Sequence, residues 1–123
     1  MIATTIEQSK HLIDRGVDIN TADMHYSTWT IIDGEWILSP NYNYTIEELQ
    51  EEYGNQIIPA WSLSALLELT PPVEITQNVD KSWNVASFTD ENKFFPTHEI
   101  ENVPNLIDAV FDMIVWLKEH KKI

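Results

Sequence analysis

The chain has 123 residues, and its 20 acidic residues outnumber its 7 lysines and arginines, which gives a formal net charge of −13. So acidic a protein lacks the basic side chains that contact phosphate groups, which excludes direct binding to nucleic acid or to an anionic membrane. The absence of cysteine excludes disulfides, thiolate nucleophiles and cysteine-ligated metals. Because 43% of the residues are hydrophobic, residues 1–123 are expected to form a single domain with its own core.

Neither a leader nor a membrane segment is expected from the sequence. Its first residues lack a basic region followed by an apolar stretch, and the most apolar run, residues 106–117, is interrupted by Asp108 and Asp112. A cytoplasmic protein without membrane contact is therefore expected.

Residues 4–16 are predicted to form the first helix. Apolar side chains recur there on one helical face, and Thr5 and Gln8 have the spacing of a capping box. Gly16 stands where a left-handed residue commonly ends a helix. An irregular connection rich in Asp, Asn and Thr is expected over residues 17–24.

Two β-prone runs, residues 26–32 and 35–38, flank Asp33 and Gly34. A two-residue Asp-Gly loop between such runs is the strongest short signal for a hairpin. The sequence therefore predicts two antiparallel strands joined by this loop.

Two helices are predicted in the middle of the chain. Thr45 and Glu48 form a second capping box, and Gly54 marks the end of a short acidic helix. Residues 57–62 then lead into an apolar helix that starts at Leu63 and is stopped by the prolines at 71–72.

The last third of the chain predicts a second hairpin, an edge strand and a final helix. The hairpin comprises residues 73–79 and 82–88, and residues 91–98 are expected to add the edge strand. The helix covers residues 106–117 and places Pro104 in its first turn. Because it is apolar on nearly every side, it either threads the domain or turns one face toward a partner.

Together these elements predict a single α+β domain. The two antiparallel hairpins are expected to form one small sheet packed against about four helices, of which the last is long and apolar. No internal repeat and no Gly/Ser/Pro linker divides the chain.

Five short segments, about a fifth of the chain, carry a resemblance. They read Gln-Ser-Lys at 8–10, Thr-Ala-Asp-Met at 21–24, Ile-Pro-Ala-Trp-Ser-Leu-Ser-Ala-Leu-Leu at 58–67, Asp-Ala-Val-Phe-Asp-Met at 108–113 and Trp-Leu at 116–117. In order and spacing the chain resembles small uncharacterised proteins of gut Bacteroidetes and of their phages and mobile elements. That family has no established activity, so the resemblance implies a genomic setting and assigns no catalytic residue.

Metal and catalytic motifs are weak. Asp23, His25, His98 and Glu99 are weak candidate metal ligands, with Glu101 as a further carboxylate near the last two. None of the four histidines lies in a recognised metal-binding spacing. The three glycines are scattered singly, so there is no phosphate-binding loop and no nucleophile elbow. We therefore expect no metal, no cofactor and no catalytic residue.

The charge distribution is the least ordinary feature of the sequence. Residues 16–80 contain eleven acidic residues and no lysine or arginine, so this part projects a negative field. The predicted interaction surface consists of Glu47, Glu48, Glu51, Glu52, Asp33 and Glu35. A second predicted surface, for a homodimer through the last helix, consists of Phe111, Ile114, Trp116 and Leu117.

These features favour a non-enzymatic interaction or accessory protein of a mobile element or phage, with a protein partner. It would act through the acidic surface or the apolar last helix. One alternative is an acidic mimic of nucleic acid that inhibits a basic host protein. Another is a small-molecule or carbohydrate-binding module, or a metal-dependent enzyme, with its site near Asp23, His25 and the hairpin aromatics Trp29, Trp36, Trp83, Tyr26, Tyr42 and Tyr44.

Overall fold

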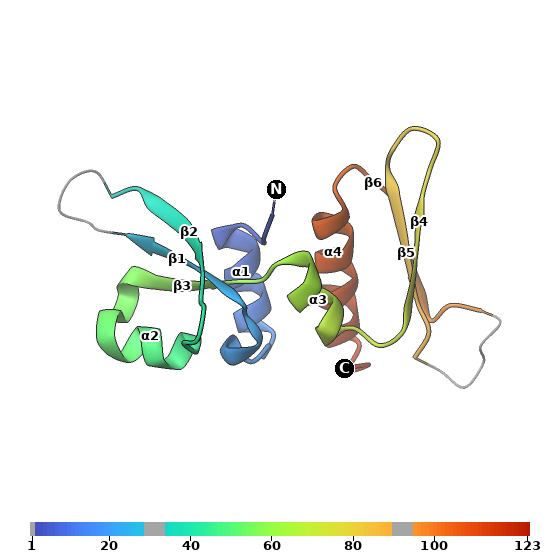
Figure 1. Ribbon diagram of the computed structural model, residues 1–123. Coiled ribbons are helices and arrows are strands. Elements are labelled where there is room, and N and C mark those ends of the chain that lie inside the picture. Colours follow the sequence, from blue (N-terminus) through green and yellow to red (C-terminus); the bar gives the residue numbers. More distant parts are fainter. Residues whose placement is uncertain (1, 29–33, 90–94) are drawn as a thin grey trace.

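The computed structural model describes residues 2–28, 34–89 and 95–123. These residues confirm the α+β class (Figure 1). The helices are α1 (Ile6–Asp14), α2 (Ile46–Tyr53), α3 (Leu63–Leu69) and α4 (Leu106–Glu119), with short 3₁₀ turns at Ile19–Thr21 and Gly54–Gln56. The strands are β1 (Met24–Thr28), β2 (Trp36–Pro40), β3 (Ile57–Ala60), β4 (Val73–Gln77), β5 (Trp83–Ser87) and β6 (His98–Val103).

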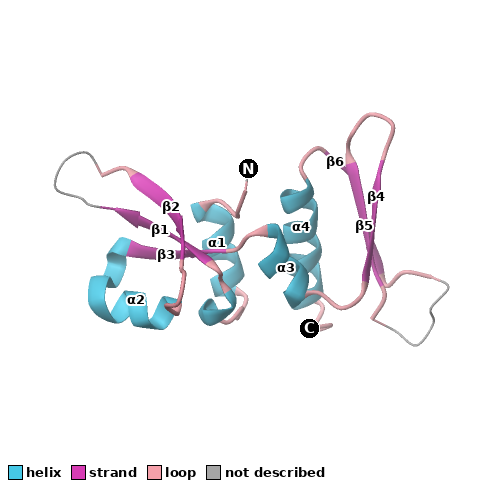
Figure 2. Cartoon of the chain, viewed as in Figure 1, coloured by secondary structure: helices cyan, strands magenta, loops and turns pink. Residues whose placement is uncertain are grey.

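The strands form two antiparallel sheets and not one. Their orders are β2-β1-β3 and β4-β5-β6. The two sheets lie at opposite ends of the molecule, with α1, α3 and α4 between them (Figures 1 and 2). Both predicted hairpins exist, but each adds a third strand of its own. Because β3 and β6 occupy the remaining edges of β1 and β5, the hairpins cannot join to each other through these central strands.

The register of the first hairpin differs from the predicted one. A two-residue loop at Asp33 and Gly34 requires Thr28 to lie opposite Ser39, whereas Thr28 pairs with Trp36 and His25 pairs with Ser39. The pairing is shifted by three residues, so the connection is longer than a two-residue turn. Residues 29–33 themselves lie outside the described ranges.

The predicted helix starts are confirmed in atomic detail. Thr5 Oγ1 accepts a hydrogen bond from the Gln8 amide at 3.1 Å, and the Gln8 side chain accepts one from the Thr5 amide at 3.0 Å. Thr45 and Glu48 form the same reciprocal pair at the start of α2. Gly16, just after α1, has a φ of +86°, a value that favours glycine.

The edge strand of the second sheet lies later in the chain than predicted. It covers His98–Val103 instead of residues 91–98, and residues 90–94 lie outside the described ranges. Its alternating half-buried and exposed residues at 98–101 match a strand that has one face against α4. His98 therefore begins the strand instead of ending it.

Helix α4 runs through the core. Its N-cap is Asn105, so Pro104 precedes the helix and does not occupy its first turn. It packs against α3, β5, β6 and α1. Six of its side chains are buried, namely Ile107, Ala109, Val110, Met113, Ile114 and Leu117. Of the two alternatives that the sequence left open, a helix that threads the domain or one that meets a partner, this burial matches the first.

Two of the four residues predicted to form a homodimer face are buried in the core, so this part of the prediction is corrected. Ile114 and Leu117 have no exposed area, so neither is available to a second copy. Phe111 and Trp116 are half-buried, and their rings contact histidines of the same chain. None of the helices in the described ranges has both the length and the apolarity needed to cross a membrane.

Candidate binding pocket and acidic surface

The acidic surface is built on α2. Ile46 is buried and Leu49 half-buried, and these two anchor the helix to the core. The four glutamates between and after them point outward, which follows from helical periodicity. Glu47, Glu48, Glu51 and Glu52 are all exposed, as is Glu35 before β2, while Asp33 lies outside the described residues.

Two of these glutamates also have structural roles. Glu48 completes the capping box of α2. The Glu47 carboxylate accepts a hydrogen bond from Asn20 Nδ2 at 3.3 Å, and the Glu47 amide donates to Asn20 Oδ1 at 3.2 Å. Glu51 and Glu52 have no such structural bond among the described residues, and they are the acids most available to a partner.

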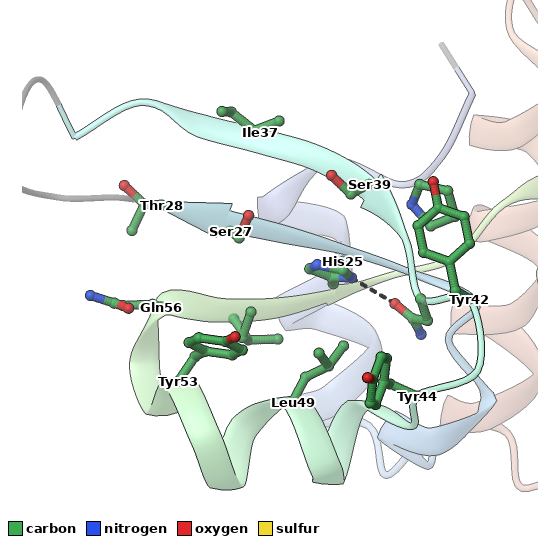
Figure 3. A pocket seen from close by; sticks show the side chains of 13 residues that line it. His25, Ser27, Thr28, Ile37, Ser39, Tyr42, Tyr44, Leu49, Tyr53 and Gln56 are labelled. Atoms are coloured by element: carbon green, nitrogen blue, oxygen red, sulfur yellow. Dashed lines mark hydrogen bonds between the residues drawn. The ribbon is translucent and has the colours of Figure 1, made fainter.

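A pocket of about 330 Å³ lies beside this surface, between α2 and one face of the first sheet (Figure 3). Strand alternation places His25 and Ser27 on this face, whereas Tyr26 points the other way and donates its hydroxyl to the Thr4 carbonyl at 2.8 Å. The aromatic part of the wall consists of Tyr42 and Tyr44 from the loop before α2 and Tyr53 from the end of the helix.

The orientation of His25 is fixed by Asn41. The buried Asn41 side chain donates from Nδ2 to the Ala22 carbonyl at 2.9 Å, so its Oδ1 must be the atom that faces His25 Nδ1 at 2.7 Å. An amide oxygen only accepts, so Nδ1 carries the proton. In the neutral ring Nε2 is then a hydrogen-bond acceptor.

Neutral polar side chains accompany His25 in this pocket, namely Ser27, Ser39 and Asn41. Ser39 lies directly opposite His25 in the sheet. Nevertheless, no serine or threonine hydroxyl in the described residues is hydrogen-bonded to His25, so the pocket does not show a nucleophile held by a base. What it offers is aromatic surface and neutral polar atoms.

Asp23 does not belong to this pocket. Its carboxylate accepts hydrogen bonds from the Ser62 amide at 2.9 Å and from the Ser62 hydroxyl. It therefore ties the start of β1 to the start of α3. The sequence interpretation that grouped Asp23 with His25 is corrected, because Asp23 precedes β1 and its carboxylate is bonded to Ser62, whereas His25 faces Asn41.

The four candidate metal ligands are not brought together. Asp23 and His25 belong to the first sheet region, whereas His98 and Glu99 lie on β6 in the second sheet (Figure 1). Within residues 2–28, 34–89 and 95–123, no group of three or more metal-ligating side chains is arranged to hold an ion.

The two hairpin tryptophans within the described residues do not form the exposed platform weighed as one alternative. Trp36 and Trp83 are half-buried, and Trp83 packs against the core. Trp29 lies outside the described residues. The exposed aromatic side chains near the first hairpin are tyrosines, with Tyr42 83% and Tyr44 59% exposed.

A three-ring stack that the sequence did not reveal lies at the second sheet. Trp116 is stacked between His98, with ring centroids 3.9 Å apart, and His120, at 4.0 Å. The i, i+4 spacing of Trp116 on α4 and His120, the C-cap of that helix, was a local signal for half of the stack. His98 comes from β6, and only the tertiary fold brings it there.

The stack makes stability depend on pH. Burial, together with the nearby charge of His120, lowers the pKa of His98 below its usual 6.5. The unfolded chain then binds a proton more readily, so stability is lost as pH falls from about 6.5 toward the folded pKa. Glu99 and Asp112 have the opposite effect at lower pH, because a raised pKa in the folded protein increases stability as these groups become protonated. A hydrogen bond with Glu101 raises the pKa of Glu99, and partial burial raises that of Asp112.

We expect His98→Gln to be less sensitive to acid than the natural chain in this window. The test is urea unfolding of both proteins at about pH 7.5 and pH 5.5, followed by circular dichroism. The loss of stability between the two pH values should be smaller in the variant, since all other titrating groups are shared. Equal losses in both proteins would contradict the assigned role of His98.

Comparison with protein-family models, curated proteins and solved structures found no significant match to this chain.

Proposed function

We propose that this protein is a non-enzymatic interaction protein, an accessory of a mobile element or phage, that binds a basic protein partner through the acidic face of α2. The observation that carries this proposal is charge segregation. Residues 16–80 hold eleven acids and no lysine or arginine, and the acids of α2 are exposed. Such a surface attracts a basic partner and accelerates their encounter.

Exposed tyrosines beside these acids support a protein interface. Tyr42, Tyr44 and Tyr53 are all exposed. The first two lie in the loop before α2, and Tyr53 is the last residue of α2, the helix that carries the glutamates. Tyrosine is enriched at protein interfaces and among the residues that contribute most to binding. Exposed acids alone serve solubility, but acids combined with exposed aromatic rings favour recognition.

The burial of α4 favours the acidic surface over the apolar last helix as the contact region. Ile114 and Leu117 have no exposed area to offer. The proposed mobile-element or phage setting is supported by the resemblance to gut Bacteroidetes proteins described above. If the partner normally binds nucleic acid, the protein acts as an acidic mimic, which is a special case of this function.

The test is capture of partners from the native host's lysate with a matched pair of variants. Glu47→Gln/Glu51→Gln/Glu52→Gln removes the exposed acids of α2 and retains the cap residue Glu48. The control Glu7→Gln/Glu68→Gln/Glu74→Gln removes three exposed acids elsewhere, so both variants have the same net charge.

A basic protein should bind the natural chain and the control at about 50 mM salt and be lost at about 500 mM, because salt screens exposed charge pairs. The α2 variant should bind the purified partner at least tenfold more weakly than the control. Equal affinity of the two variants would contradict the proposal, and so would binding that salt does not weaken.

A second candidate, a small-molecule or carbohydrate-binding module, is favoured by the pocket itself. A volume of about 330 Å³ is at the lower end of ligand pockets, and tyrosine rings are suitable surfaces for sugar rings. Protein NMR spectra recorded with a panel of methyl glycosides distinguish this candidate, since it requires shifts confined to the pocket.

A further inference from the structure

We propose that the pocket beside His25 receives an arginine side chain of the basic partner. This inference rests on the proposed function, because it names the group that the partner inserts. A guanidinium group is planar, carries five N–H donors and a positive charge, and stacks on aromatic rings. The pocket has a complementary feature for each of these properties.

Aromatic surface is the first complementary feature. Tyr42 and Tyr44 border one end of the pocket and Tyr53 contributes from the last turn of α2 (Figure 3). A cation over a tyrosine face is attracted by the electrons of the ring. Tyr44 is 59% exposed although it is an aromatic residue, so its ring remains accessible to a guest.

The second complementary feature is the set of hydrogen-bond acceptors in the pocket. Because Asn41 fixes the proton of His25 on Nδ1, the neutral imidazole offers Nε2 as an acceptor. Ser27 and Ser39 line the same sheet face and have hydroxyls that accept as well as donate. A guest that only donates hydrogen bonds, as a guanidinium does, satisfies these atoms.

The third complementary feature is the negative charge around the pocket. No lysine or arginine occurs between residues 16 and 80, so none lines the pocket, while the helix that supplies Tyr53 also carries Glu51 and Glu52. The field at the pocket is therefore negative. A neutral sugar would gain nothing from this field, and an anionic guest would be repelled. The charge therefore favours arginine among the guests that stack on tyrosine.

The test is NMR titration of the full-length protein with a blocked tripeptide, acetyl-Gly-Arg-Gly-amide. Its analogue with citrulline has nearly the same shape without the charge, and its analogue with lysine keeps the charge without the planar group. The arginine peptide should shift pocket resonances, and the citrulline peptide should bind at least tenfold more weakly. The lysine peptide should bind at least threefold more weakly.

Two variants locate the binding. Tyr44→Ala removes an exposed ring of the pocket and should weaken binding of the arginine peptide at least fivefold. Phe95→Ala removes a ring that is 71% exposed and lies outside the pocket lining, and it should change the affinity less than twofold. The spectra of the free variants show directly whether each retains the fold.

Equal binding of the arginine and citrulline peptides, or shifts confined to residues outside the pocket, would overturn the inference. Pocket shifts with a methyl glycoside but not with the arginine peptide would instead assign the pocket to sugars. If the peptide fails while the α2 glutamate variant still loses a basic partner, only this inference fails. If the peptide binds but no salt-sensitive partner exists, the proposed function fails.

Discussion

Replacing Trp61 with alanine is expected to lower the free energy of unfolding by about 3–5 kcal/mol. Trp61 is the largest fully buried side chain and belongs to the core cluster that contains α3 and α4 residues. Its indole donates to Thr21 Oγ1 at 3.0 Å, so truncation leaves a cavity and removes a hydrogen bond. Since a domain of this size is stabilised by only about 5–15 kcal/mol, the loss is a large share of the total.

The measurement is urea unfolding followed by circular dichroism. Phe95→Ala is the control because it removes an aromatic side chain that is 71% exposed, and its effect should stay within about 0.5 kcal/mol. Thr21→Val removes the acceptor of the indole together with the hydrogen bond that Thr21 Oγ1 donates to the Asp18 carbonyl at 2.6 Å, and it should cost about 1–2 kcal/mol. A loss below about 1 kcal/mol for Trp61→Ala would show that the residue is not part of a packed core.

Trp61 also fixes the segment between β3 and α3. Its backbone exchanges hydrogen bonds with Thr4, whose amide donates to the Trp61 carbonyl at 2.9 Å and whose hydroxyl accepts from the Trp61 amide at 3.1 Å. The buried Thr4 hydroxyl is also paired with Ser9 at 2.8 Å. The link between β3 and α3 is thus held against the start of α1.

The elements predicted correctly from the sequence are those encoded within a few residues. A capping box needs only a donor and an acceptor three positions apart, so Thr5 with Gln8 and Thr45 with Glu48 specified their helices locally. In the structure α3 also has a local start signal, because the Ser62 hydroxyl accepts a hydrogen bond from the Ala65 amide at 3.3 Å.

The division into two sheets could not be predicted in this way. Residues 57–60 form a strand only because β1 offers them an edge, and Pro59 argues against a strand in the interior of a sheet. In the structure β3 is an edge strand, so the proline is tolerated. With β3 paired to β1, the first hairpin becomes a three-stranded sheet and does not need the second hairpin beside it.

In the candidate site, too, the features encoded by neighbouring residues were predicted, and those that depend on the tertiary fold were not. The acids of α2 were identified from composition and helical spacing, and the structure shows them exposed. The pocket required His25, Asn41 and Tyr53 to meet from a strand, a loop and a helix. The sequence associated His25 with Asp23, its near neighbour, because it contains no information that the Asp23 carboxylate turns to Ser62 while His25 faces Asn41.

The second large effect is expected in α4, where Ile114→Ala should lower the free energy of unfolding by about 2–5 kcal/mol. Ile114 has no exposed area and lies in the core cluster with Met113 and Leu117. Truncation therefore leaves a cavity inside a single chain. Ile123→Ala is the matched control, because Ile123 is 37% exposed at the end of the chain and should change stability by less than about 0.5 kcal/mol.

Protein concentration distinguishes a core residue from a dimer contact. If Ile114 packs within one chain, the unfolding midpoint of each protein should not change between about 1 μM and about 100 μM. The difference between the natural protein and the variant should therefore be the same at both concentrations. A dimer held through α4 would instead become more stable with concentration, by mass action, and the variant would lose that dependence. Light scattering at the higher concentration provides the independent check. A concentration-dependent midpoint that Ile114→Ala abolishes would mean that α4 repacks against a second copy, and that its burial within one chain is not the state in solution.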